Sequence, residues 1–205
     1  MRPVPNAIGS LRGTTFGMKI TGAVLCGGAS TRMGQDKASL VLAGRPMVDW
    51  VADAMRQAQV EPVVALGGQE GLSLPVLPDE IGDQGPLHVL ISALERLGDI
   101  VVCPCDVPLV SAKLFRSIVS AGVVTDKPVV LAKSSQLQPL IGLYKESSID
   151  LLKAGYEAGK RGPKLVLKDH DVEVVAASVD ETQNINTPAQ LKALIDDLTI
   201  KNDES

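Results

Sequence analysis

Two parts of the chain carry residues whose types and spacing suit phosphate and metal chemistry. The first is the segment 25–37, which contains three glycines, two hydroxyl side chains, Arg32 and Lys37. Glycine allows main-chain N–H groups to approach a ligand closely and to line an anion-binding concavity. The two basic side chains supply charge that suits a polyphosphate. Because the segment follows an apolar, strand-like run, we predict that the N–H groups at Gly27 and Gly28 cradle phosphate groups.

The segment does not match two familiar phosphate-binding motifs. It lacks Gly-Lys-Ser/Thr at the spacing of a Walker A loop, and it is not a Gly-x-Gly-x-x-Gly fingerprint. Neither a P-loop NTPase nor a dinucleotide-dependent oxidoreductase is therefore supported. The alternative is that this segment is a flexible surface loop whose basic residues have no binding function. The strand before the segment and the paired basic residues favour the phosphate loop.

The second part is Asp106, which follows an apolar run in the sequence Pro-Cys-Asp-Val-Pro at 104–108. A carboxylate at the carboxyl end of a strand, beside a phosphate loop, is placed to hold Mg²⁺. This ion prefers one or two carboxylates together with phosphate oxygens and water. The alternative is a turn-forming aspartate ahead of Pro108. The local sequence alone leaves both interpretations open.

Strand-like apolar runs alternate with segments of helical period along the chain. The expected strands are 20–26, 63–66, 74–77, 100–105, 129–132, 140–144 and 173–177; the expected helices are 46–58, 87–97, 111–120, 147–158 and a final helix capped by Thr187. This alternation predicts an α/β sandwich with a mostly parallel sheet. Ligands bind beyond the carboxyl ends of the strands in such sheets. We expect the loops after Cys26, Leu77 and Cys105 to meet there.

The composition limits the classes of function. Of 205 residues, 45% are hydrophobic and 21% charged, which is typical of a globular protein. A net charge of −4 and only 2% aromatic residues argue against a nucleic-acid surface. No apolar run approaches the ~18 residues of a membrane span. Three cysteines without paired spacing indicate a reducing compartment, so we expect a cytoplasmic protein. We expect residues 1–17 to be a disordered leader or a misassigned start, 18–200 a single domain, and 201–205 a flexible tail.

The pattern Leu-Cys-Gly-Gly-x-Ser-x-Arg-Met-Gly-x-Asp-Lys at 25–37 resembles the signature of the molybdenum cofactor guanylyltransferases (MobA). Three further segments are similar to family motifs: Pro-Cys-Asp-x-Pro at 104–108, Gly-Pro-Leu at 85–87 with Asp79 ahead of it, and Asn-x-Asn-Thr-Pro at 184–188. The resemblance implies a three-layer α/β/α sandwich of the nucleotide-diphospho-sugar transferase (Rossmann-like) type. It extends from residue 20 to about residue 195, which is nearly the whole chain.

The resemblance also implies an activity: Mg²⁺-dependent transfer of GMP from GTP to the phosphate of molybdopterin, with release of pyrophosphate. It implies catalytic roles for Arg32, Lys37 and Asp106, with Asp106 as the metal ligand. It places the nucleotide against Leu25, Cys26, Gly27, Gly28, Lys37, Leu66, Asp79, Gly85 and Asp106. It places the acceptor against Lys164, Asn184 and Asn186. The partners it implies are GTP and molybdopterin, together with enzymes that make or accept the molybdenum cofactor.

Two departures from the family pattern keep alternatives open. Family members often carry an asparagine that helps to read guanine at the end of the second strand, where this chain has Ala65-Leu66. The chain also continues Gly-Pro-Leu with His88-Val89 instead of small residues. A cytidylyl- or other nucleotidyltransferase acting on molybdopterin or a sugar phosphate is therefore an alternative. A non-catalytic nucleotide-binding carrier is another, although the presence of both Lys37 and Asp106 speaks against it.

Overall fold

The computed structural model describes residues 19–27, 40–68, 71–78, 84–168 and 170–203. Their centre is a seven-stranded sheet with the order β5-β4-β1-β6-β8-β7-β9. Its strands are β1 (Thr21–Leu25), β4 (Val63–Leu66), β5 (Val76–Leu77), β6 (Ile100–Pro104), β7 (Val129–Lys133), β8 (Leu137–Tyr144) and β9 (Glu173–Ala176). Strand β8 runs antiparallel to β6 and β7, and the other neighbouring strands are parallel. The predicted mostly parallel sheet is confirmed.

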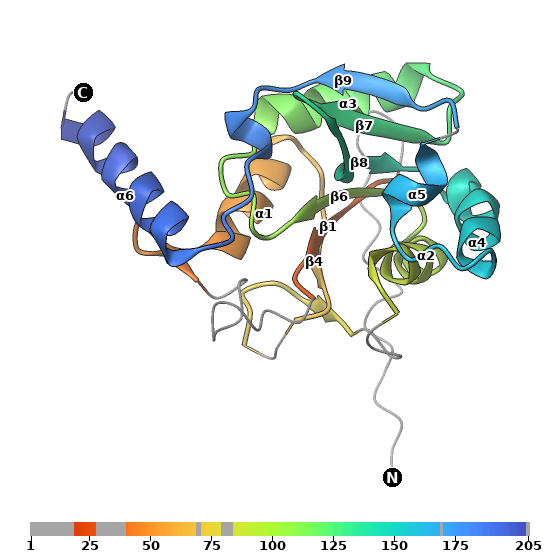
Figure 1. The fold of residues 1–205 in the computed structure, drawn as a ribbon, viewed down its shortest axis with the longest axis horizontal. Coiled ribbons are helices and arrows are strands. Elements are labelled where there is room, and N and C mark those ends of the chain that lie inside the picture. The colour runs from red at the N-terminus through yellow and green to blue at the C-terminus, as the bar shows by residue number, and fades with distance from the viewer. Residues whose placement is uncertain (1–18, 28–39, 69–70, 79–83, 169, 204–205) are drawn as a thin grey trace, which may run out of the picture.

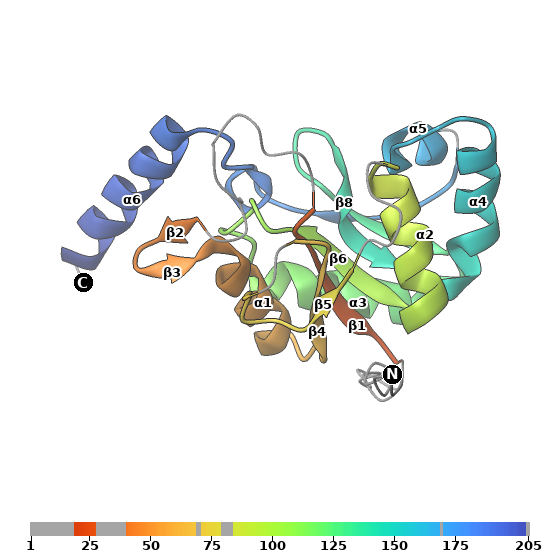
Figure 2. The same cartoon turned by 90° about the horizontal axis from the view of Figure 1, so that it is seen from below.

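Helices cover both faces of the sheet. On one face α1 (Met47–Gln57) and α3 (Ala112–Val124) pack their apolar residues against a large core cluster. On the other face α2 (Pro86–Leu97), α4 (Ile149–Glu157) and α5 (Pro163–Leu167) enclose a second cluster. Figures 1 and 2 show these two helical layers on opposite sides of the strands. The predicted three-layer α/β/α sandwich is therefore present.

The central strands are buried along almost their whole length. Every residue of β4 is buried, and in β1 and β6 only the last residue is partly exposed. A parallel strand covered by helices on both faces loses the apolar–polar alternation of a one-sided sheet. This explains why these strands lack polar–apolar alternation and consist mostly of Val, Ala, Leu and Ile in the sequence. The backbone of β1 and β6 first becomes partly exposed at the carboxyl end of each strand.

The final helix, α6 (Pro188–Asp203), lies outside the sandwich (Figure 2). Its Leu191, Leu194 and Ile195 belong to a small third cluster with Leu40, Leu42, Met47, Trp50 and Ile185. The cluster includes the hairpin of β2 (Val41–Leu42) and β3 (Arg45–Pro46). These three apolar side chains of α6 are thus packed against the cluster.

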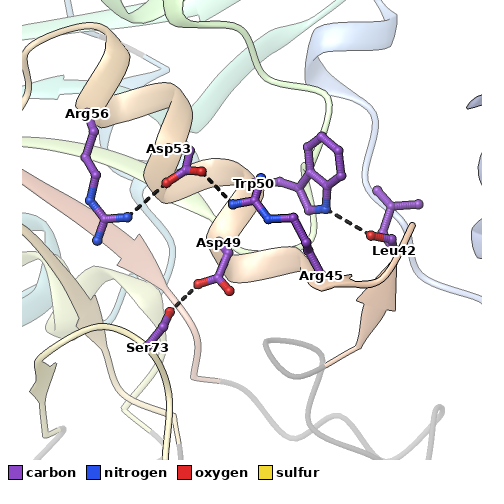
Figure 3. A network of polar contacts seen from close by, with 7 residues as sticks. All are labelled: Leu42, Arg45, Asp49, Trp50, Asp53, Arg56 and Ser73. Carbon is purple, nitrogen blue, oxygen red and sulfur yellow. Dashed lines mark hydrogen bonds and ion pairs between the residues drawn. The ribbon is translucent and has the colours of Figure 1, made fainter. Parts of the chain in front are cut away.

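Polar contacts fix the hairpin to the first helix (Figure 3). The Trp50 indole N–H donates to the carbonyl of Leu42 at 3.1 Å, and the Arg45 guanidinium lies 5.1 Å from the Trp50 ring centroid. Asp53 accepts from Arg45 at 2.5 Å and from Arg56 at 3.0 Å. These two cations lower the pKa of the Asp53 carboxyl, chiefly through the hydrogen bond from Arg45. These contacts attach the β2–β3 hairpin, which follows the glycine-rich segment in the sequence, to helix α1.

Some elements differ from the sequence prediction. The β2–β3 hairpin and helix α5 were not predicted from the sequence. Helix α3 continues to Val124 instead of ending at residue 120, because Gly122 sits closely against Leu143 of the sheet and the turn stays packed. The predicted N-cap is correct: Ser111 Oγ accepts from the N–H of Leu114 at 3.1 Å. No helix in the described part of the chain is long and apolar enough to cross a membrane.

Candidate active site

The ends of three neighbouring strands form the floor of the candidate site. The N–H of Cys26 donates to the carbonyl of Leu66 at 3.0 Å, and the N–H of Cys105 donates to the carbonyl of Leu25 at 3.0 Å. These bonds extend the parallel pairing of β1 with β4 and β6 by one residue beyond the strands. The chain therefore leaves β1, β4 and β6 at the same edge. This is the arrangement expected for the loops after Cys26 and Cys105.

At Gly27 and Gly67 this edge presents main-chain atoms without side chains. A Cβ atom on Gly67 would lie only 3.2 Å from the Cα atom and 3.3 Å from the nitrogen of Gly27. Gly67 also has a φ of +69°, which side chains rarely adopt. Gly27 and Gly67 thus approach each other closely through their backbone atoms. Sequence reasoning used Gly67 only as the end of a strand and missed this contact; its signal is the Gly-Gly pair at 67–68.

Asp106 lies at the end of β6 and is nearly buried, with 8% of its surface exposed. Its Oδ1 accepts a hydrogen bond from Asn184 Nδ2 at 3.1 Å. Its main-chain carbonyl accepts from the N–H of Ile185 at 2.8 Å. Two predicted site residues far apart in the sequence, Asp106 and Asn184, are therefore in direct contact. The amide holds the carboxylate in one orientation.

The remaining acceptor-side predictions are placed separately. Asn186 follows two residues after Asn184, where its N–H donates to Gln190 Oε1 at 2.8 Å at the start of α6. Lys164 is exposed on α5, a helix that packs against α4 and β8. The structure thus assigns Asn184 to the group around Asp106 and Lys164 to the α2–α4–α5 layer.

The donor atoms at the end of β6 suit a hard divalent cation. A carboxylate beside phosphate groups fits the one or two carboxylates with which Mg²⁺ is usually bound. The described residues contain no group of three or more His, Cys, Asp or Glu side chains that would form an all-protein metal cage. Asp106 is therefore a candidate ligand for such an ion.

Cys103, which lies on β6 three residues before Asp106, is not a reactive nucleophile. Burial raises the pKa of the Cys103 thiol well above its usual range, and the negative charge of Asp106 raises it further. A buried thiol in apolar surroundings stays protonated and inert. Its side chain packs within the core cluster under β6. Cys103 therefore contributes packing to the site.

Gly85 marks the second edge of the site, at the start of α2. It is the N-cap of that helix and has a φ of +81°. The N–H of Leu87 donates to the carbonyl of Arg161 at 3.1 Å, so the segment that leads to Lys164 lies against Gly85. The main-chain carbonyl of Arg161 thus connects the segment around Gly85 to the segment that contains Lys164.

Several predicted residues lie outside the described residues: Gly28, Arg32, Lys37 and Asp79. The roles assigned to them stay predictions. Leu66 is 2% exposed, its side chain packs in the core under α2, and its carbonyl accepts from Cys26. Any contact of Leu66 with a ligand would therefore be made by its main chain.

The family assignment rests on comparisons with known proteins. The MobA-like NTP transferase domain family matches residues 22–174. A molybdenum cofactor guanylyltransferase of Xanthomonas euvesicatoria pv. vesicatoria is 33% identical over 85% of this chain and 94% of its own length. One from Cereibacter sphaeroides is 34% identical over 70% of this chain and 78% of its own length.

Solved structures support the same fold. Molybdopterin-guanine dinucleotide biosynthesis protein A of Archaeoglobus fulgidus superposes with a TM-score of 0.71 at 24% identity, covering 87% of this chain and 98% of its own. The 4-diphosphocytidyl-2C-methyl-D-erythritol synthase of Anaerococcus prevotii has a TM-score of 0.67 at 10% identity, covering 88% and 98%. The protein is a nucleotidyltransferase, and it belongs to the MobA-like NTP transferase family, as the motifs at 25–37 and 104–108 predict.

Proposed function

We propose that this protein transfers GMP from GTP to the phosphate of molybdopterin, releasing pyrophosphate, in molybdenum cofactor biosynthesis. The observation that carries the proposal is the buried Asp106 carboxylate, held by Asn184 at the strand edge where the glycine-rich segment begins. The relatives named as molybdenum cofactor guanylyltransferases support the choice of substrates. Mg²⁺ dependence and the identity of both substrates are part of the proposal.

The reaction does not require a nucleophilic side chain. The terminal phosphate of the acceptor is an anion at neutral pH, and one of its oxygens forms a bond to the α-phosphorus of GTP. The bond from that phosphorus to the bridging oxygen of the β-phosphate breaks, and pyrophosphate leaves with the electron pair. Catalysis of this kind comes from holding the reactants in line and stabilising charge. The protonated Cys103 thiol agrees with this chemistry, because it offers no competing nucleophile.

The described residues supply position and charge. The bare backbone at Gly27 and Gly67 lets the nucleotide approach the main chain closely. Asp106 would hold Mg²⁺, whose charge, when bound, offsets the negative charge of the phosphates. The hydrogen bond from Asn184 keeps the carboxylate in the orientation needed for this. Arg32 and Lys37, which lie outside the described residues, would neutralise the departing pyrophosphate.

Transfer of a different nucleotide is the second candidate. At the end of β4 the side chains of Ala65 and Leu66 are buried, and the next two residues are glycines. These four positions therefore offer no side-chain amide with which to read a guanine edge. A cytidylyl- or other nucleotidyltransferase acting on molybdopterin or a sugar phosphate fits the same phosphate and metal site.

Thermal unfolding with each nucleotide separates the candidates. A ligand at 100 times its dissociation constant should raise the free energy of unfolding by about 2.7 kcal/mol, a clear shift in Tm. GTP with Mg²⁺ should stabilise the protein selectively, and the shift should shrink with a chelator. Pyrophosphate release should then depend on both GTP and molybdopterin. Selective stabilisation by CTP would favour the second candidate, and tight binding without pyrophosphate release would favour a non-catalytic carrier.

A further inference from the structure

The start of helix α2 is capped by a carbonyl from a distant part of the chain. The first N–H groups of a helix have no partner within the helix. At α2 the N–H of Leu87 donates to the carbonyl of Arg161, 3.1 Å away. A Cβ atom on Gly85 would lie 2.8 Å from the same carbonyl oxygen. Glycine at 85 is therefore needed both for its φ of +81° and for the close approach of the Arg161 main chain.

Side-chain contacts hold this carbonyl in place. The Arg161 guanidinium lies 4.3 Å from the centroid of the Tyr156 ring, and its Nη1 donates to the carbonyl of Tyr156 at 3.0 Å and to that of Lys160 at 3.1 Å. The Tyr156 hydroxyl donates to Gln84 Oε1 at 2.6 Å, directly before Gly85. The last turn of α4 is thus attached to the start of α2 by a side-chain contact, and the loop after α4 by a main-chain contact.

This attachment joins the two sides of the proposed reaction. Gly85 is a predicted nucleotide-binding residue, and Lys164, a predicted acceptor-binding residue, follows Arg161 by three positions on α5. The hydrogen bond from the Leu87 N–H to the carbonyl of Arg161 links the segment that contains Gly85 to the segment that contains Lys164. We call this link, with the contacts of Tyr156 and Arg161 that hold it, the joint. Movement of the α5 segment must carry the start of α2 with it, or break the hydrogen bond.

We propose that Arg161 and Tyr156 are positioning residues that couple the nucleotide site to the acceptor site. The proposal rests on the function proposed above. A ligand that shifts one of the two segments shifts the other through the shared joint, and so favours binding at the other site. Such coupling is reciprocal, with each ligand raising the affinity for the other by the same factor.

Two variants test the joint without removing charge near Lys164. Tyr156→Phe keeps the ring under the guanidinium and deletes the hydroxyl that donates to Gln84. Arg161→Lys keeps the positive charge and loses the flat group that stacks on Tyr156. One net hydrogen bond corresponds to about a fivefold change in an equilibrium constant. We therefore expect the KM values for both substrates to rise by about fivefold, with kcat changed by less than about twofold.

The decisive measurement is the coupling factor itself. The Kd of α,β-methylene-GTP with Mg²⁺, which cannot transfer GMP, is measured by calorimetry with and without molybdopterin. In the wild type, molybdopterin should lower this Kd by about fivefold or more, within the usual range of coupling. In Tyr156→Phe and Arg161→Lys the factor should fall to less than about twofold. A purely structural role would lower Tm and leave the factor unchanged.

Matched controls come from the same chain. Arg116 is an exposed arginine on the opposite helical layer whose Nη1 donates to the carbonyl of Gln57 at 3.0 Å, so Arg116→Lys should leave the factor intact. Gly159→Ala places a side chain at a φ of +84° with nothing within 4 Å, whereas Gly85→Ala adds the clash with Arg161. Of these two glycine variants, Gly85→Ala should abolish coupling and Gly159→Ala should keep it.

The outcomes separate the inference from the proposed function. If the wild type transfers GMP but shows no coupling, or if both joint variants keep the wild-type factor, the coupling role is wrong while the function stands. If the wild type neither binds the analogue nor transfers GMP, the proposed function fails and the inference fails with it.

Discussion

Exchanging Asp106 and Asn184 would separate the role of the negative charge from the role of the hydrogen bond between them. Asn184 Nδ2 donates to Asp106 Oδ1 at 3.1 Å, and the two side chains differ only in which one carries the carboxylate. In the double variant Asp106→Asn/Asn184→Asp the bond can form in the opposite direction. The charge then sits on the segment before α6 instead of at the end of β6.

The expected effects on stability and on activity differ. A hydrogen bond to a charged group contributes about 1.5–3 kcal/mol and a neutral one about 0.5–1.5 kcal/mol. Asp106→Asn should therefore lower the free energy of unfolding by only about 1 kcal/mol. Asn184→Asp alone sets two carboxylates side by side and should cost more, and the exchange should recover most of that loss. Turnover should fall by about 100-fold or more in Asp106→Asn and in the exchange, which corresponds to about 2.7 kcal/mol.

Chemical denaturation of all four proteins gives the stability cycle, and pyrophosphate release with saturating GTP, Mg²⁺ and acceptor gives kcat. The coupling energy of the cycle shows whether the hydrogen bond has re-formed. If the exchanged protein is stable and recovers activity to within about tenfold of the wild type, the charge at 106 is not required. The assignment of Asp106 as the metal ligand would then be wrong.

Three further predictions follow from contacts in the sheet. Gly67→Ala should weaken Mg²⁺–GTP binding by about tenfold, because its Cβ would press on the backbone of Gly27 at 3.2 Å. Calorimetry measures this change in affinity. The control Gly71→Ala, at a φ of +97° with nothing within 4 Å, should bind like the wild type. Burial raises the pKa of the Cys103 thiol, so the unfolded chain loses this proton first as the pH rises. The stabilisation is complete below about pH 8.5 and declines above it by about 1.4 kcal/mol per pH unit; urea titrations should show a smaller decline in Cys103→Ala. Gly142→Ala should lower the free energy of unfolding by about 1–3 kcal/mol, since its Cβ would overlap the carbonyl oxygen of Val130; an unchanged Tm would contradict the tight packing of β8 on β7.

Sequence patterns predicted the sandwich and the strand ends because both depend on local features. Continuous apolar runs identify strands buried on two faces, and the polar residues after them mark the carboxyl edge. The β2–β3 hairpin was missed because Ala43, and not the usual asparagine or aspartate, adopts a positive φ of 48° at its turn. Helix α5 has only five residues, too few for a periodic pattern.

The contacts that define the site depend on long-range packing. The motifs at 104–108 and 184–188 suggested functions for Asp106 and Asn184, but their hydrogen bond requires the chain to return to β6 after β9. The cap on α2 uses the main-chain carbonyl of Arg161, an atom that every residue possesses. The sign of this contact in the sequence is the glycine at position 85, where a side chain would collide with the carbonyl of Arg161.

The return of the chain to Asp106 also bears on when the enzyme matures during its synthesis. The last strand of the sheet ends at Ala176, whereas the donor to Asp106 is Asn184 and the cluster around α6 needs residues up to Ile195. All seven strands have therefore been translated before the partner of Asp106. A nascent chain whose β9 has just emerged from the ribosome can pair its whole sheet while the carboxylate still lacks the Asn184 amide. Release of the last helix from the ribosome would then convert a folded scaffold into a complete site.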